Sequence, residues 1–192
     1  MTYVFAKISG IPENRIIGSG TILDTSRLQS YLAKKFCISP KNVHAYVYGE
    51  HGDSAFVPWS LANISNIPID EYKESSPDKD RIEWNSDYED VEDFVKKSGA
   101  IIIENKGATF YAVAMSVCHI CKCIFAGAGT ALSISSMMHG EYGIDDVCLS
   151  TLAIVDNTGV RGKLMNKLNE KELVKLKLSA DKLKSVIDQI TF

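Results

Sequence analysis

NVHAYVYGEHGDSAFVPW, residues 42–59, is the stretch that decides how this chain folds. Its first part, Val43–Tyr48, is rich in β-branched and aromatic residues, which predicts a strand. The turn Gly49–Asp53 follows, with a glycine on each side of His51. Ala55–Trp59 predicts a second strand. We therefore expect a hairpin whose turn presents one histidine on a rigid support.

Helices and a short strand are predicted on the amino-terminal side of this hairpin. Residues 1–9 predict a helix that ends at Gly10, and residues 15–20 predict a strand with a turn. The sequence TILD at residues 21–24 resembles a capping box, and apolar residues then recur at helical spacing. We therefore expect a helix from about residue 21 to about residue 36.

Two further helices are predicted after the hairpin. Residues 69–94 hold 11 of the 24 acidic residues, which predicts a solvated loop leading into an exposed helix near Tyr88. Gly107 separates this helix from the next one, at 108–126. The apolar composition of the second helix predicts that it is buried rather than membrane-spanning, because three polar residues interrupt it.

After Gly129 the pattern changes to that of short strands, at 131–137, 147–155 and 160–164. A final helix begins near Leu168, and its predicted apolar side consists of Leu173, Leu176, Leu178, Leu183 and Ile187. Helices segregated from antiparallel strands define an α+β fold. We expect residues 1–192 to form a single domain of antiparallel strands with long packed helices.

Composition excludes several classes of protein. The net charge of −3, from 21 basic and 24 acidic residues, shows no basic bias toward nucleic acid. Five cysteines, three of them crowded at 118–123, predict reduced thiols rather than a disulfide framework. The amino terminus lacks the order of a signal peptide. We therefore expect a soluble cytoplasmic protein with neither a nucleic-acid nor a membrane partner.

Three residues are candidates for chemistry, each with an ordinary alternative. His51 has a side chain suited to proton transfer near neutral pH, but taken alone it is more typical of a turn histidine that caps a backbone carbonyl. Asp24 and Arg27 share a helix face, so they could be a helix-capping carboxylate and its surface ion-pair partner. In the functional interpretation, the aspartate orients a histidine and the arginine binds a carboxylate through two parallel hydrogen bonds.

No metal site is expected. The sequence Cys118-His-Ile-Cys121-Lys-Cys123 lacks a second pair of ligands and lies in an apolar helix, where cysteine behaves as a small hydrophobe. The acidic run at 69–94 lacks the alternating ligands and central glycine of a calcium loop.

Four segments taken together resemble a known family. SGIPENRIIGSGTILDTSRLQ, NVHAYVYGEHGDSAFVPWS, KGATFYAVAMSV and HGEYGIDDVCLSTLAIVDNTGV follow one another along the chain. In this order they closely resemble the second half of the L-lactate and malate dehydrogenase superfamily, with bacterial L-lactate dehydrogenases the nearest likeness. The resemblance implies the C-terminal catalytic domain of an NAD-dependent oxidoreductase. Such an enzyme interconverts L-lactate and pyruvate in glycolysis and pyruvate fermentation, and many members are homo-oligomers.

The resemblance also implies roles for individual residues. His51 matches the histidine that gives and takes the proton, and Asp24 matches its carboxylate partner. Arg27 matches the arginine that binds the substrate carboxylate, Thr109 the threonine that lines the substrate pocket, and Ser19 a serine near the nicotinamide. His44 matches the histidine of the fructose 1,6-bisphosphate site found in allosteric members. Gln29 stands where that site has an arginine, and it offers neither charge nor a fork for phosphate.

No Gly-x-Gly-x-x-Gly motif opens a strand–helix unit, so we expect the N-terminal Rossmann domain of the family to be absent from this chain. Only the nicotinamide end of NAD would then contact these residues, and the chain by itself would be inactive. The family segment that separates lactate from malate enzymes is missing too. Two alternatives therefore stay open: a malate or other 2-hydroxyacid dehydrogenase, and a truncated, non-catalytic chain that only assembles with itself or with a full-length partner.

Overall fold

A long antiparallel ladder between β4 (Thr130–His139) and β5 (Asp145–Asp156) is the centre of the fold, and β6 (Gly159–Lys163) extends it. The computed structural model describes residues 1–190. Consecutive residues of β5 are buried, which means that both faces of this sheet are covered. The three strands predicted after Gly129 are confirmed, each to within a few residues at its ends.

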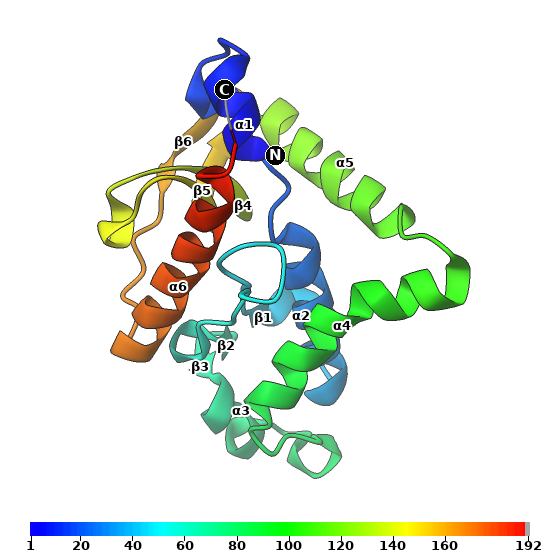
Figure 1. Cartoon of the computed structure of the whole chain (residues 1–192). Helices are drawn as coiled ribbons and strands as arrows, with labels where there is room; N and C mark the ends of the chain where they lie inside the picture. Colours follow the sequence, from blue (N-terminus) through cyan, green and yellow to red (C-terminus); the bar gives the residue numbers. More distant parts are fainter. Residues whose placement is uncertain (191–192) are drawn as a thin grey trace.

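Helices pack along this sheet (Figure 1). α6 (Glu170–Ile187) contributes Leu176 to a buried cluster with Leu149 of β5. At the other end of the sheet, Ile22 of α2 (Ile22–Lys35) and Ile120 of α5 (Tyr111–Ala126) pack in a second cluster. A short helix, α1 (Thr2–Ile8), lies where the sequence predicts one and packs through Tyr3.

A second core lies between α2 and α4 (Tyr88–Lys106). One side of it consists of Leu28 and Leu32 of α2 and of Phe36, which directly follows the helix, and these residues are buried at helical spacing as predicted. The small sheet formed by β1 (Val43–His44), β2 (Asn63–Ile64) and β3 (Ile67–Pro68) closes this core. Gly107 ends α4 in the left-handed conformation, at φ 76°, which confirms its predicted role as the break between two helices.

The predicted hairpin is shorter than expected. β1 comprises only Val43–His44, and a single bridge joins Tyr48 to Phe56 where a ladder was predicted. The physical reason is that side chains of α2, rather than a neighbouring strand, bond the peptide groups of Val47. The strand predicted at residues 15–20 is likewise reduced to one bridge, between Gly18 and Ser135.

The acidic segment 69–94 is more ordered than its charge predicts. It contains α3 (Ile69–Ser75), and Ile69, Ile82 and Trp84 are buried in the core beside α2. The loop prediction is wrong here because a few buried anchors outweigh many exposed charges in deciding local structure. The helix start near Tyr88 is confirmed.

The prediction that the apolar helix at 108–126 is buried is wrong for this chain. Only Ser116, Ile120 and Cys123 of α5 are buried, whereas Met115 is 67% and Phe125 86% exposed. Figure 1 shows α5 at the edge of the molecule, with one side against the rest of the chain. Among the described residues, no helix combines the length and the apolar character needed to span a membrane.

α6 begins with a complete capping box, formed between Asn169 and Glu172. Of its predicted apolar side, Leu176 is fully buried. The prediction for Leu178 is wrong, since this side chain is 60% exposed. Ser179 and Ala180 are buried instead of Leu178. Ser179 faces the loop around His51, where its Oγ accepts a hydrogen bond from the Glu50 N–H.

These two leucines give a matched test of the fold. Leu176→Ala should lower the free energy of unfolding by about 2–5 kcal/mol, because it opens a cavity in the cluster with Leu149. Leu178→Ala should change it by less than about 0.5 kcal/mol, as is usual at the surface. Urea unfolding followed by circular dichroism measures both values, and equal losses would contradict the packing of α6 described above.

Candidate active site

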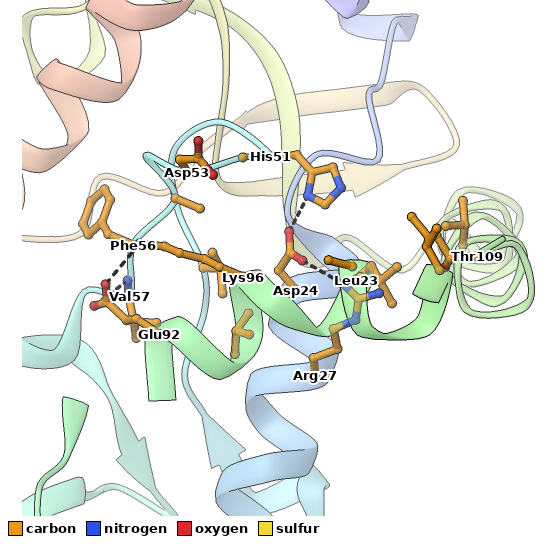
Figure 2. A pocket seen from close by; sticks show the side chains of 18 residues that line it. Leu23, Asp24, Arg27, His51, Asp53, Phe56, Val57, Glu92, Lys96 and Thr109 are labelled. Atoms are coloured by element: carbon orange, nitrogen blue, oxygen red, sulfur yellow. Dashed lines mark hydrogen bonds and ion pairs between the residues drawn. The ribbon is translucent and has the colours of Figure 1, made fainter. Parts of the chain in front are cut away.

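Asp24 lies between His51 and Arg27 and bonds to both (Figure 2). Its Oδ2 is 2.6 Å from His51 Nδ1, and its Oδ1 accepts a hydrogen bond of 3.2 Å from Arg27 Nη1. The aspartate is only 5% exposed, whereas the imidazole side chain is 61% exposed. A buried carboxylate therefore holds one edge of the histidine while the rest of the ring stays accessible.

The ordinary alternatives for these residues describe this geometry only in part. Thr21 is the N-cap residue of α2, but its side chain makes no capping bond, so the predicted capping box is wrong. Thr21 Oγ1 donates instead to Val47 O. The His51 ring bonds to a carboxylate and not to a backbone carbonyl. The Asp24–Arg27 ion pair does form, and it is largely buried, with the Arg27 side chain 14% exposed.

Two threonines of α2 bring the aspartate and the histidine together. Thr21 Oγ1 donates to Val47 O at 2.5 Å, and Val47 N donates to Thr25 Oγ1 at 2.9 Å. One turn of helix separates the two threonines, so their hydroxyl groups lie on the same face. They bond to the C=O and to the N–H of one residue, Val47, in the extended segment before His51. The segment is thereby fixed against α2 at the level of Asp24.

The large sheet also bonds to this segment and to the start of α2. Thr25 Oγ1 is 2.8 Å from Ser133 Oγ of β4, and Gly49 exchanges both backbone hydrogen bonds with Ser150 of β5 at 3.0 Å. Ser150 Oγ also accepts from the backbone N–H of Thr21. The segment that leads to His51 is therefore bonded to both a helix and a sheet.

The surroundings of His51 favour its protonated form. The hydrogen bond to Asp24 raises the pKa of His51 above its ordinary value, against the opposing effect of burial. The charge of Asp24 adds to the increase, that of Glu50 adds further, and that of Arg27 opposes it. The stabilisation that protonated His51 gives to the fold is therefore fully present below pH 6.5, and it is lost as pH rises through the raised pKa of His51.

A cavity of about 340 Å³ opens beside these three residues. Arg27 and His51 line it, and Thr109 reaches it from the connection between α4 and α5. Much of the remaining wall is apolar and includes Val57, Val95, Ala100, Ile103 and Val113. The cavity has the size and polarity of a site for a small organic acid.

Ser19 lies in the wall of a second cavity, of about 480 Å³, which also includes His51. His51 is therefore placed where two cavities meet. His44 lies elsewhere: it pairs with Asn63 in the small sheet and lines neither of these cavities. Gln29, the residue in place of the family arginine, donates its side-chain N–H to Ala45 O.

Three charged residues of the first cavity, Asp53, Glu92 and Lys96, are not singled out by the sequence. Glu92 of α4 accepts hydrogen bonds from the Val57 N–H and from Trp59 Nε1, and it lies 3.8 Å from Lys96 and 3.7 Å from Lys175. It was counted with the acidic run of a solvated surface. Only the spacing of Glu92 and Lys96, four residues apart, signalled a partner.

The cysteines of α5 form no metal centre in the described part of the chain, where no group of three or more potential ligands gathers. His119 Nε2 lies 3.8 Å from Cys123 Sγ, and Cys118 and Cys121 are exposed thiols.

Comparison with known proteins identifies the family. The model of the lactate/malate dehydrogenase alpha/beta C-terminal domain matches residues 21–191. The L-lactate dehydrogenase of Clostridium botulinum (strain 657 / Type Ba4) is 43% identical over 189 residues, which are 98% of this chain and 58% of that protein. The chain thus spans about three fifths of the length of this relative.

Solved structures agree. The minor L-lactate dehydrogenase from Enterococcus mundtii superposes with a TM-score of 0.90 at 36% identity, over 100% of this chain and 60% of that one. The lactate dehydrogenase MGS-M5, from a Medee basin deep-sea metagenome library, gives 0.91 at 39% identity, over 97% and 59%. The fold is therefore shared with the corresponding part of these lactate dehydrogenases. This chain belongs to the lactate/malate dehydrogenase family and corresponds to its C-terminal domain.

The bond between Asp24 and His51 can be tested directly in the 192-residue chain. Asp24→Asn should lower the pKa of His51, because the substitution removes the negative charge and the charged hydrogen bond that raise it. Proton NMR titration of the four imidazoles measures this change. His139, which pairs with Glu13, is the internal control and should not shift. An unchanged His51 titration would contradict the pairing.

Proposed function

We propose that this chain is the catalytic and substrate-binding part of an NAD-dependent L-lactate dehydrogenase. The observation that carries the proposal is the placing of Arg27, Asp24 and the exposed imidazole of His51 in the wall of one small, largely apolar cavity. A cytoplasmic location, a role in pyruvate metabolism and a homo-oligomeric state are parts of the same proposal, and they rest on the family.

His51 acts as the general base in lactate oxidation. Its Nδ1 is engaged by Asp24, which leaves Nε2 to take the proton of the substrate hydroxyl. As that O–H bond breaks, its electrons form the C=O bond of pyruvate and the C2 hydrogen leaves as hydride. In pyruvate reduction the protonated ring returns its proton to the carbonyl oxygen. Asp24 stabilises the imidazolium in both directions.

Arg27 positions the substrate. Its guanidinium has five N–H donors, of which Nη1 contributes one to Asp24. The others can bind the substrate carboxylate in a bidentate pair, which turns C2 toward His51. Because the ion pair with Asp24 is buried, the guanidinium is held in one orientation before substrate arrives.

The walls of the cavity favour a monocarboxylate. Val95, Ile103 and Val113 suit the methyl group of lactate better than the second carboxylate of malate. Lys96 is the remaining cation of the cavity wall, and Glu92 lies 3.8 Å from its ammonium group. These observations support lactate over the malate alternative.

The second cavity suits the nicotinamide end of NAD, since Ser19 and Ser135 line it together with His51 and offer hydroxyl groups for the carboxamide. When bound there, NAD would supply the hydride acceptor of the reaction. The exposed apolar side chains of α5, including Met115 and Phe125, support association with further protein.

An active enzyme is needed to test the role of Arg27, so the N-terminal part of the Clostridium botulinum relative is fused before residue 1. Reduction of pyruvate by NADH is the assay. Arg27→Lys should lower kcat/KM by about ten- to a hundredfold, because the charge stays but a charge-assisted bidentate contact is lost. A preference for oxaloacetate over pyruvate would favour the malate alternative.

The matched control is Arg81→Lys, because Arg81 makes the same i,i+3 contact of 3.2 Å, with Asp78, at an exposed site. It should leave kcat/KM unchanged. If Arg27→Lys lowered the melting temperature while sparing kcat/KM, Arg27 would be a structural ion-pair partner only.

The 192-residue chain assayed alone should neither oxidise NADH in the presence of pyruvate nor bind NADH saturably. In this proposal the described residues contact NAD at its nicotinamide end. Because this contact involves few atoms, it gives little binding free energy. The fluorescence of NADH measures its binding, and its absorbance at about 340 nm measures its oxidation. Sub-millimolar binding of NADH would refute the expectation and indicate a cofactor site not described above.

A further inference from the structure

The loop that carries His51 is bonded to the C-terminal helix at both of its ends. Ser179 of α6 is fully buried, and its Oγ accepts a hydrogen bond of 2.8 Å from the backbone N–H of Glu50. The same oxygen accepts a hydrogen bond of 2.9 Å from Ser54 Oγ. One hydroxyl group on a helix therefore joins the residue before His51 to the end of the turn.

The side chain of Glu50 adds to this attachment. Its Oε1 accepts from the backbone N–H of Ser54 at 3.2 Å and lies 2.7 Å from Lys182 Nζ. Lys182 follows Ser179 by three residues, so both side chains leave α6 on the same face. Ser179 and Lys182, which lie on one face of α6, thus both hold the loop.

Gly49 makes this close approach possible. A Cβ atom at residue 49 would lie 2.7 Å from Ser179 Oγ, and the backbone there has φ +96°, a conformation that favours glycine. The glycine before His51 therefore serves the contact with α6 as well as the turn itself.

The histidine has little else to fix it. Its side chain is 61% exposed, and among the described residues its ring is hydrogen-bonded to Asp24. The position of the ring is consequently set by the backbone of the loop. A catalytic group must be held within about 0.5 Å of its productive position, and the supporting bonds decide whether it is.

We propose that Ser179 is a positioning residue of the active site, which holds the loop 49–54 so that His51 Nδ1 meets Asp24. The C-terminal helix α6 is thereby part of the catalytic apparatus, although it contributes no group to the reacting atoms. This inference rests on the proposed function of His51. A merely structural Ser179 would affect stability alone, whereas a positioning residue also affects the contact between His51 and Asp24.

The test measures that contact in the 192-residue chain without requiring activity. Proton NMR titration gives the pKa of His51 in the unmodified chain, Ser179→Ala, Ser54→Ala and Asp24→Asn, and His51→Gln identifies the signal. Ser136→Ala is the matched control, because Ser136 is also buried and its Oγ has no hydrogen-bond partner within residues 1–190. The charged groups that act on His51, namely Asp24, Arg27 and Glu50, are the same in all the serine variants, and so are Lys182 and Asp53 next to Glu50.

Ser179→Ala should lower the pKa of His51 to a value between those of the unmodified chain and Asp24→Asn. Ser54→Ala, which removes one of the two bonds at Ser179, should lower it less, and Ser136→Ala should leave it unchanged. The amide proton of Glu50 should exchange about two- to tenfold faster in Ser179→Ala, as expected for one lost hydrogen bond. Ser54→Ala keeps the proposal testable if Ser179→Ala does not fold.

The outcomes separate this inference from the proposed function. If Asp24→Asn lowers the pKa of His51 and neither serine variant does, Ser179 is structural and the inference is wrong, while the Asp24–His51 pair stands. If Asp24→Asn has no effect, the proposed pair fails and the inference fails with it. A lower melting temperature of Ser179→Ala with an unchanged His51 titration also overturns the inference.

Discussion

The structure of the site depends on how two threonine side chains of α2 hold the backbone of Val47. In an ordinary hairpin these peptide groups would bond to a neighbouring strand. Here Thr21 donates to the carbonyl oxygen and Thr25 accepts from the N–H, so a helix replaces the strand as partner. Since Asp24 lies in the same turn of α2, the bonds that satisfy the backbone also bring a carboxylate to the histidine four residues further along.

One buried carboxylate then serves two cations. An isolated buried charge is strongly unfavourable, and Asp24 is acceptable in its position because each oxygen has a charged or ionisable partner. The arrangement fixes the orientation of Arg27 and raises the pKa of His51 at once. In the proposed function, substrate binding by Arg27 and proton transfer by His51 would therefore be coupled through Asp24, and a change at Asp24 would affect both.

Much of the fold was predictable because its signals are local. The helical spacing of Leu28 and Leu32, the break at Gly107 and the strands after Gly129 each reflect a repeating pattern within a few residues. The errors have a common cause. Leu178 was assigned to the buried side of α6, and the acidic segment 69–94 to a loop, because periodicity and charge do not say which neighbour lies across from a residue.

By itself, the sequence determined the family, the helices and strands with strong periodicity, and the identity of His51, Asp24 and Arg27 as candidates. Only the tertiary structure decided that Asp24 faces the histidine rather than caps its helix, that the hairpin is bonded to α2, and that Ser179 joins α6 to the histidine loop. The physical reason is the separation along the chain over which each effect acts. Propensity and spacing act over a few residues, whereas these hydrogen bonds join residues 22 to 129 positions apart and exist only once the chain has packed.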